Sequence, residues 1–393
     1  MRTVAEHLAE VLSHVQPLAT ENVALAHARG RVLSRAVIAP LDLPPFTNSA
    51  MDGYAVIAGD VSAEVSLEVT DDIPAGAVAR DAVRPGTAHR IMTGAPMPLG
   101  ADAVVPVEWT DGGGSQVSID RAVAVGANIR LQGEDVRSGE RVLEAGALIT
   151  PGVVALLASL GIVEVPVTRL ARVGILATGS EIIEPGLPLL PGQIYDSNAP
   201  LLRATLEAAG AEVVVLDRKV DDPIGFIEHV QQHAGGLDLL LTTGGISAGA
   251  YEVVKDALAG HLDFIKVAMQ PGMPQGLGRV GQLVVIALPG NPVSVAVSFE
   301  VFVRPALRVL QGHPDAGPRY ASARIVEQLP SRGDKQQYRR GWFDAPRGEV
   351  HSVGGTGSHL VGALAHSNCL IVIPPNENPL SAGTMVHIIA MHT

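Results

Sequence analysis

The sequence predicts an α/β multidomain protein whose central part is a doubly wound, mainly parallel sheet. Apolar runs alternate there with helix-like stretches, and glycine-rich loops follow several of the runs. Such alternation is typical of strand–helix–strand units with right-handed crossovers. The predicted strands lie at 171–177, 211–216, 237–241, 264–268 and 283–288, and the predicted helices lie at 198–209, 223–233 and 251–258.

Residues that favour helix ends occur at suitable places in this region. Asn198 and Asp221 are predicted N-caps, because their side chains can accept a hydrogen bond from a free backbone N–H. Gly210 is a predicted C-terminal stop, since glycine adopts the left-handed conformation at low cost. Asn291 and Pro292 predict an N-cap followed by proline at the first helical position.

The two flanking regions follow other patterns. Residues 3–15 have apolar side chains at helical spacing, and a second apolar helix is predicted at 152–160, after Thr150 and Pro151. Between about 40 and 130, short strand-like pieces are divided by glycine and proline, which predicts a mostly β module. The chain after Pro318 again predicts short strands and turns.

Length and composition limit the classes of protein. A chain of 393 residues exceeds the size of one compact core, so about two to four domains are expected. The net charge of −12 and the aromatic content of 3% argue against binding of nucleic acid by charge or base stacking. The single cysteine, Cys369, excludes an intramolecular disulfide framework, and its apolar surroundings predict a buried, inert thiol.

No segment has the pattern of a signal peptide or a membrane span. Charged and histidine residues are spread over residues 1–15. The longest apolar region, 283–303, is interrupted by Pro289, Asn291 and Glu300. We therefore expect a soluble, cytoplasmic protein that does not enter a membrane.

Four unusual loops are predicted at the carboxyl ends of the strands, where ligands bind in sheets of this kind. In one of them an apolar run ends at Gly244 and Gly245, which would expose backbone N–H groups suited to phosphate or another oxyanion. A tight turn that binds nothing explains this loop alone equally well. Together the four loops predict a pocket, and they read TGSE at 178–181, TTGGISAG at 242–249, QPGMPQG at 270–276 and LPGNPVS at 288–294.

Two clusters in the N-terminal half carry more polar chemistry than a scaffold requires. TNSAMDGYAV at 47–56 places Asn48, Ser49 and Asp52 around a glycine, and RIMTGAPMP at 90–98 places Thr93 and Gly94 between prolines. Turns rich in Asn, Ser and Asp are usually only turns. From the residues alone, a structural role is favoured for each cluster.

Nine motifs, read in order along the chain, resemble the MoeA family of molybdopterin molybdenumtransferases, which share their fold with the C-terminal domain of gephyrin. The resemblance extends from about residue 5 to the C-terminus, and its specificity comes from the shared order. The motifs are NSAMDGYAV, RIMTGAPMP, ILATGSE, YDSNAPLL, DDP at 221–223, TTGGISAGAYEVVKD, KVAMQPG, ALPGNPVS and GTGSHL at 355–360.

The resemblance implies an elongated homodimer whose subunit has four parts. A discontinuous dimerisation domain would comprise 1–40 and 132–168, and a β-rich insertion would occupy 41–131. A molybdopterin-binding α/β domain would span 169–315, followed by a small β-barrel at 316–393. The active site would lie in a cleft between the sheet domain and the β-rich insertion of the other subunit.

The implied reaction inserts molybdate, as a substrate, into adenylated molybdopterin and releases AMP. Mg²⁺ would neutralise the phosphates, and it prefers oxygen ligands with retained waters. The resemblance implies roles in catalysis for Asp52, Thr93, Glu181, Asp221 and Glu252. Asp221 and Glu252 are the predicted Mg²⁺ ligands, Asp52 and Glu181 would orient a water or molybdate, and Thr93 would donate to an oxyanion.

The loops and the resemblance together predict a substrate-binding set. Lys266 is included because a buried lysine on an apolar strand needs an anionic partner, which could be a phosphate or an internal carboxylate. Simpler explanations exist for other members, since Asp221 could only cap a helix, Glu252 could be solvated, and Arg339 and Arg340 could be surface charges. The set is Gly94, Ser180, Thr243, Gly244, Gly245, Ser247, Gly249, Lys266, Pro289, Gly290, Asn291, Ser294, Ser358 and His359.

Two departures from the family pattern concern the predicted site. Glu252 stands where many members carry aspartate, which changes the reach toward a metal. Met273 stands where many members carry lysine, which weakens the attraction for anions in that loop.

Two other functions remain as alternatives. A molybdopterin adenylyltransferase, the enzyme of the preceding step and a candidate partner, has a similar sheet domain, but its glycine loop typically reads TTGGTG and it lacks the N-terminal motifs. A gephyrin-like scaffold would bind receptor peptides at the dimer edge.

Overall fold

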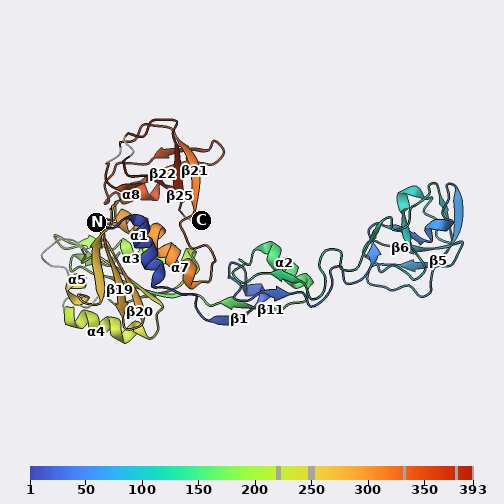
Figure 1. Ribbon diagram of the computed structural model, residues 1–393, viewed down its shortest axis with the longest axis horizontal. Coiled ribbons are helices and arrows are strands. Elements are labelled where there is room, and N and C mark those ends of the chain that lie inside the picture. The colour runs from blue at the N-terminus through green and yellow to red at the C-terminus, as the bar shows by residue number, and fades with distance from the viewer. Residues whose placement is uncertain (218–222, 247–252, 331–332, 377–378, 392–393) are drawn as a thin grey trace. The chain divides into compact units, whose positions relative to one another are not determined.

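The computed structural model describes residues 1–217, 223–246, 253–330, 333–376 and 379–391 (Figure 1). The chain forms two compact units. The first comprises Met1–Asn22, Gly30–Ser34 and Pro166–Thr393, and the second comprises Val23–Arg29 and Arg35–Val165. We call them the sheet unit and the insertion unit. Two of the four chain boundaries between them fall within β1 (Thr20–Ala24) and β11 (Glu164–Thr168), and η1 (Leu25–His27) follows β1.

The sheet unit contains a six-stranded mixed sheet. Its first four strands are parallel neighbours, whereas β19 is antiparallel to both of its neighbours. The five strands other than β19 therefore all run in the same direction, and the predicted mainly parallel sheet has one reversed strand. The strands, in spatial order, are β15 (Glu212–Val215), β12 (Arg172–Ala177), β16 (Leu239–Thr243), β20 (Leu283–Leu288), β19 (Pro274–Val280) and β17 (Leu262–Lys266).

Strand β19 was missed by the sequence prediction, which treats 270–276 as a loop. Its glycines hide the strand pattern, yet the sheet requires them. A Cβ on Gly278 would stand 2.1 Å from the carbonyl oxygen of His261, and one on Gly276 would stand 2.8 Å from the ring of Phe264. The close approach of β17 to β19 therefore excludes side chains at these two positions.

Helices cover both faces of the sheet, as predicted for a doubly wound fold (Figure 1). Side chains of β16 alternate between the faces: Leu239 and Leu241 lie in one core and Leu240 in the other. The first core also contains side chains of α1 (Val4–Ser13), α3 (Asn198–Ala208), α6 (Pro292–Ser298), the π-helical segment η4 (Phe299–Val303) and α7 (Arg304–Leu310). The second contains side chains of α4 (Pro223–Ala234) and α5 (Val253–Ala257).

The helix ends test the predicted caps. Gly210 follows α3 with φ +75°, and Asn291 is the N-cap before Pro292 at the start of α6, so both positions are confirmed, although the Asn291 side chain makes no capping hydrogen bond. The N-cap prediction for Asn198 is wrong, because Asn198 is the first helical residue. Instead, Oδ1 of Asp196 accepts hydrogen bonds from the N–H groups of Asn198 and Ala199 at 2.9 and 3.1 Å. Asp221 lies outside the described residues.

The C-terminal part of the sheet unit is a five-stranded β-barrel, as the family resemblance implies. Its strands pair in a closed ring, and β18 (Met269–Gln270), which follows β17, adds to β22 in parallel. Cys369 lies in the barrel core, where burial raises the pKa of its thiol to about 12. In ring order the strands are β22 (Gln336–Asp344), β23 (Glu349–Ser352), β21 (Tyr320–Ile325), β25 (Met385–Ala390) and β24 (Cys369–Ile373), and α8 (Val361–Ala365) precedes β24.

The insertion unit is mostly β, in agreement with the prediction for residues 40–130. Its five-stranded sheet has the spatial order β7 (Ala103–Pro106), β4 (Gly53–Val56), β6 (Thr87–Ile91), β5 (Val65–Ile73) and β8 (Gln116–Ile119). The remaining elements are β2 (Val37–Ile38) paired with β10 (Arg141–Leu143), β3 (Asn48–Ser49) paired with β9 (Ile129–Arg130), the short helices η2 (Ala58–Asp60) and η3 (Val107–Trp109), and α2 (Pro151–Ser159).

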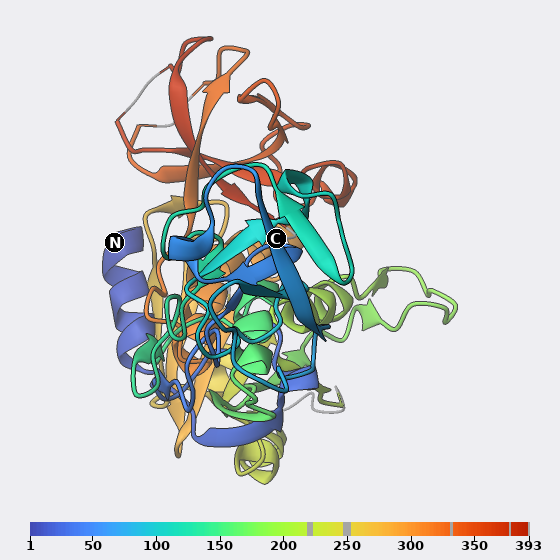
Figure 2. The ribbon, with the colours of Figure 1, turned by 90° about the vertical axis from the view of Figure 1, so that its right-hand side faces the viewer.

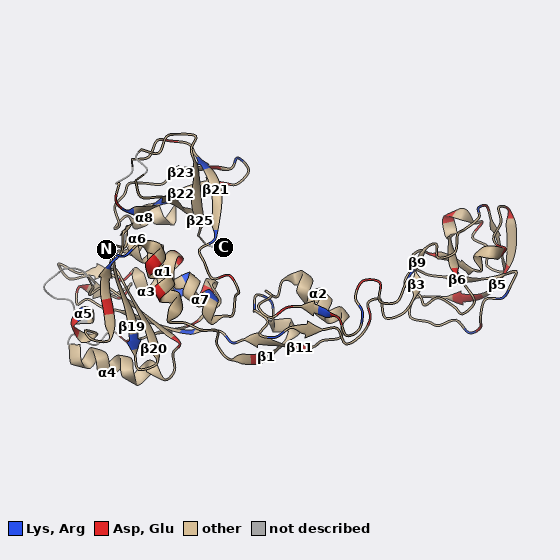
Figure 3. Ribbon diagram, in the orientation of Figure 1, with Lys and Arg blue, Asp and Glu red and all other residues tan. Residues whose placement is uncertain are grey.

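Charged residues of both signs are dispersed over the two units (Figure 3). Across the described ranges, no helix is both long enough and apolar enough to cross a membrane. A loop between the short parallel strands β13 (Ile182–Ile183) and β14 (Ile194–Tyr195) projects from the sheet unit (light green, Figure 2).

Candidate functional site

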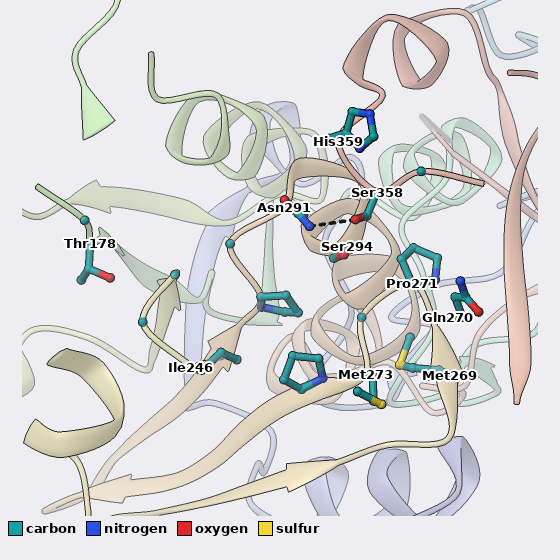
Figure 4. Close-up of a pocket in the computed structure, with 18 of the residues that line it drawn as sticks. Thr178, Ile246, Met269, Gln270, Pro271, Met273, Asn291, Ser294, Ser358 and His359 are labelled. Carbon is teal, nitrogen blue, oxygen red and sulfur yellow. Dashed lines mark hydrogen bonds between the residues drawn. The ribbon is translucent and has the colours of Figure 1, made fainter. Parts of the chain in front are cut away.

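The sheet unit contains a cavity of about 910 Å³ at the carboxyl ends of its strands (Figure 4). All four loops singled out from the sequence contribute to its wall, which confirms the predicted pocket. A turn of the barrel contributes the opposite side. The lining residues are Thr178, Gly179, Glu181, Ile182 and Ile194, then Gly244–Ile246, Met269–Pro274, Pro289–Asn291 and Ser294, and finally Lys335 and Thr356–His359.

The cavity lies at the switch point of the sheet. From β12 the chain passes through α3 to β15 on one side, and it then returns through α4 to β16 on the other side of β12. The loops that leave β12 and β16 therefore diverge, and such a divergence opens a crevice in α/β sheets. Thr178 and Gly244 are the first residues after these two strands, and both line the cavity.

The glycine turn after β16 has no room for side chains. Gly244 and Gly245 have φ of +85° and +65°, which favours glycine. A Cβ on Gly244 would stand 2.9 Å from the carbonyl oxygen of Thr178, and one on Gly245 would stand 2.8 Å from a methyl group of Val254. The turn thus presents bare backbone to the cavity.

The barrel turn is joined to the sheet by hydrogen bonds. Nδ2 of Asn291 donates to Oγ of Ser358 at 2.8 Å, and the N–H of Val293 donates to the carbonyl of Ser358 at 3.1 Å (Figure 4). Arg340, 5% exposed, donates to the carbonyls of Gly355 and Gly357 from behind the turn. Arg340 is therefore a buried support of the turn, and its interpretation as a surface charge is wrong.

The charged groups of the cavity are few. Among the described lining residues, Lys335 is the single Lys or Arg and Glu181 the single carboxylate. Sequence reasoning missed Lys335, because it lies in the mixed-charge stretch SRGDKQQYRR, where nothing separates it from a surface lysine. Met273, in the wall beside Pro274, carries no charge.

Nine of the predicted site residues line the cavity, and three described ones of the sheet unit do not. Thr243 is fully buried in β16, and Ser180 is exposed outside the wall. Lys266 is exposed at the end of the edge strand β17, so the premise that it is buried was wrong. The nine are Glu181, Gly244, Gly245, Pro289, Gly290, Asn291, Ser294, Ser358 and His359. Asp221, Ser247, Gly249 and Glu252 lie outside the described residues.

The remaining predicted residues form a small cluster in the insertion unit. Oδ1 of the exposed Asp52 accepts hydrogen bonds from the N–H and the hydroxyl of Thr93, at 2.7 and 2.6 Å. These bonds hold the pKa of the Asp52 carboxyl below its usual value. Gly94 follows with φ +80°, and its N–H donates to the carbonyl of Ser49 at 2.8 Å. The two N-terminal motifs are thus brought together.

The described part of the chain holds no group of three or more His, Cys, Asp or Glu side chains suited to a metal ion. The two predicted metal ligands, Asp221 and Glu252, lie outside that part. Within it, Glu181 lines the cavity, and its carboxylate makes no ion pair or hydrogen bond with another described side chain, so it offers oxygen ligands of the kind Mg²⁺ prefers.

The protein is therefore a multidomain α/β protein. Its cavity lies at the switch point of a doubly wound sheet, is closed on one side by a barrel turn, and is large enough for a small molecule. Three family profiles match the chain: the MoeA N-terminal region (domain I and II) at 2–161, a probable molybdopterin binding domain at 174–309, and the MoeA C-terminal region (domain IV) at 322–391.

Full-length relatives extend these matches. Molybdopterin molybdenumtransferase 2 of Mycobacterium tuberculosis (strain H37Rv) is 47% identical, over 99% of this chain and 99% of its own. Molybdopterin molybdenumtransferase of Haemophilus influenzae is 38% identical, over 95% of this chain and 94% of its own. The crystal structure of the molybdopterin biosynthesis MoeA protein from Pyrococcus horikoshii OT3 superimposes with a TM-score of 0.87 at 31% identity, covering 100% of each chain.

The chain therefore belongs to the MoeA family of molybdopterin molybdenumtransferases, enzymes of molybdenum cofactor biosynthesis.

Proposed function

We propose that the protein inserts molybdate into adenylated molybdopterin in a Mg²⁺-dependent reaction that releases AMP. The observation that carries this proposal is the cavity at the switch point. Its volume of about 910 Å³ is at the upper end of the range for small-molecule sites, which suits a substrate that joins a pterin to a nucleotide. The relatives' names supply the class of reaction.

The anionic parts of the substrate would bind where the cavity offers donors. Lys335 supplies a positive charge, Ser358 and Asn291 supply polar side chains, and the glycine turn supplies the N–H of Gly245, since that of Gly244 donates to the carbonyl of Leu288. These groups are suited to phosphate and molybdate oxygens. Apolar side chains of the wall, among them Ile246 and Met269, would face the less polar part of the substrate.

Asp221 and Glu252 are the proposed Mg²⁺ ligands, and the metal, when bound, would polarise phosphorus and neutralise the phosphate oxygens. Glu181 would orient a water or the molybdate from the cavity wall. Asp52, held ionised by Thr93, would have the corresponding role in the insertion unit. Since Thr93 donates its hydroxyl to Asp52 here, its own proposed donation to an oxyanion requires that hydroxyl to rotate.

We further propose a homodimer in which the insertion unit of one copy completes the site of the other, with the four-part domain division given above. The molybdopterin adenylyltransferase of the preceding step would supply the adenylated substrate. Because nucleotide adducts of this kind are made inside the cell, we propose a cytoplasmic location.

The first experiment mixes purified protein with adenylated molybdopterin, Mg²⁺ and molybdate, and it follows AMP release with each component omitted in turn. We expect release that needs both ions and no ATP. A requirement for ATP would indicate an adenylyltransferase instead. No release from folded protein, together with capture of a receptor peptide, would indicate a scaffold.

The second experiment tests the residues. Asp221→Ala and Glu252→Ala should fold normally and lose turnover, whereas unchanged rates in both variants would remove the metal assignment. Glu228→Ala is the control, since Glu228 is an exposed residue on α4 that does not line the cavity.

A further inference from the structure

Two buried carboxamides lie directly behind the cavity wall. Asn198, the first residue of α3, is 3% exposed, and its Nδ2 donates a hydrogen bond to the carbonyl of Gly290 at 2.7 Å. Gln275 of β19 is 1% exposed, and its Nε2 donates to the carbonyl of Gly272, also at 2.7 Å. Gly290 and Gly272 both line the cavity, so each carboxamide holds one carbonyl of the wall.

The same two peptide groups present free donors on their other side. A trans peptide points its C=O and N–H in opposite directions, and the bonds after Gly290 and Gly272 are trans. Their N–H groups belong to Asn291 and Met273, which both line the cavity. Neither N–H has a hydrogen-bond partner within the described residues. An unpaired N–H beside a cavity is available to a ligand.

The orientation of each carboxamide is fixed by its neighbours. Gln275 also donates from Nε2 to Oγ of the buried Ser298 at 2.8 Å, and Gly272, at φ +97°, leaves room for this arrangement. Because a carbonyl oxygen only accepts, the NH₂ side must face Gly272 and Gly290. The amide oxygens of Gln275 and Asn198 have no partner in the described part of the chain, so both side chains act as donors only.

Packing alone does not account for two such side chains. A buried amide oxygen without a hydrogen bond costs free energy, and an apolar side chain of similar size would avoid that cost. Both carboxamides are nevertheless placed at the cavity wall, and each is bonded to a glycine carbonyl there. Their common effect is to fix the orientation of the two wall peptides, whose carbonyl oxygens accept these hydrogen bonds.

We propose that Asn198 and Gln275 are positioning residues, which orient two wall peptides so that the N–H groups of Asn291 and Met273 bind a tetrahedral oxyanion of the substrate. The proposal rests on the proposed function. It names the chemistry that phosphate and molybdate share, since both present oxygen atoms that accept from N–H groups. Asn198 and Gln275 act from behind the wall, and they do not touch the substrate.

The test compares Asn198→Ala and Gln275→Leu with wild type. We expect kcat/KM for AMP release to fall about tenfold or more in each variant, as for other losses of aligned donors. Gln311→Leu is the matched control: Nε2 of Gln311 donates to the carbonyls of Ala209 and Gly210 at 2.9 and 3.1 Å, outside the cavity. Its kcat/KM should stay within about twofold of wild type.

A pH profile separates positioning from packing. Gln275→Glu keeps the size of the side chain, and its protonated form can donate to Gly272 whereas its ionised form cannot. Its kcat/KM relative to wild type should therefore fall as the pH rises, while Gln275→Leu stays low throughout. Parallel profiles of these two variants would overturn the proposal, because a packing role does not depend on the proton.

Binding measurements identify the oxyanion and separate this proposal from the proposed function. Calorimetric dissociation constants for AMP and for molybdate are measured for wild type, Asn198→Ala and Gln275→Leu, with melting temperatures as the check on folding. Weakened binding of AMP assigns the N–H groups to phosphate, and weakened binding of molybdate assigns them to molybdate. Unchanged binding of both overturns the positioning role, even if wild type releases AMP. If wild type releases none, weakened binding still supports that role.

Discussion

His7 is fully buried on α1, with its ring edge-on to Phe302 of η4 and 4.7 Å between ring centroids. Neither ring nitrogen has a hydrogen-bond partner among the described residues. Burial, with a smaller contribution from Arg2, lowers the pKa of His7 from 6.5 to about 4. The folded protein thus keeps this imidazole neutral at a pH at which the unfolded chain protonates it.

The stability of the protein should therefore depend on His7 in mildly acidic solution. Between pH 6.5 and about 4 the unfolded state binds more protons, so lowering the pH destabilises the fold, by up to about 3 kcal/mol from this group. Above pH 6.5 the contribution is constant. In urea unfolding, His7→Leu should show a smaller loss of the free energy of unfolding over this range. The exposed His27→Leu is the control, and equal slopes for His7→Leu and wild type would contradict the argument.

Met273 offers a second prediction for a single residue. The described cavity wall holds one lysine and one carboxylate, so one added positive charge changes its balance. Met273→Lys should tighten the binding of molybdate by roughly three- to tenfold at low salt, and the gain should shrink as salt screens the charge. Met385→Lys on β25 adds the same charge at a position outside the cavity, and this variant should bind molybdate as wild type does. An equal gain in both variants would show that only net charge matters.

At the scale of elements, β17 and β19 depend on glycine. Gly278→Ala would place a Cβ 2.1 Å from the carbonyl oxygen of His261, in the backbone of the neighbouring segment. We expect a loss of about 2 kcal/mol or more in the free energy of unfolding, because the two strands must separate. Gly59→Ala is the control, since a Cβ there meets nothing within 4 Å. A Gly278→Ala variant as stable as wild type would exclude this strand geometry.

The same elements show what the sequence can and cannot reveal. The parallel strands were predictable because Leu239, Leu240 and Leu241 belong to a continuous apolar run, which a strand buried on both faces requires. The reversed strand β19 was not, since the glycines that let it approach β17 erase the apolar signal. Asparagine is a common N-cap residue, so Asn198 was a reasonable prediction. The carboxylate of Asp196, two residues earlier, instead accepts the free N–H groups at the start of α3.

For the site, the rule that ligands bind at the carboxyl ends of strands predicted most of the cavity. Lys335 was missed because it precedes β22 of the barrel, and only tertiary structure brings it to the same cavity as Ser358. The buried state of Arg340 was missed for the same reason. Lys266 was misjudged because an edge strand leaves its end in solvent, which the apolar pattern of 264–268 does not reveal.

At the scale of the whole molecule, the open question is which copy supplies Asp52 to a given cavity. Asp52 belongs to the insertion unit, and Glu181 belongs to the sheet unit. Under the proposed homodimer the two act in one site although they come from different copies. Each of the variants Asp52→Asn and Glu181→Gln should then be nearly inactive alone, since every site of either dimer lacks one carboxylate.

Mixing the two inactive variants distinguishes the arrangements. After subunit exchange, about half of the dimers contain one copy of each variant. In such a dimer the intact Asp52 of the Glu181→Gln copy meets the intact Glu181 of the other copy, and the second site lacks both groups. AMP release should therefore recover to about a quarter of the wild-type rate. If Asp52 and Glu181 act within one copy, every site in the mixture lacks a carboxylate and no activity returns. Co-purification of differently tagged copies verifies that exchange has taken place.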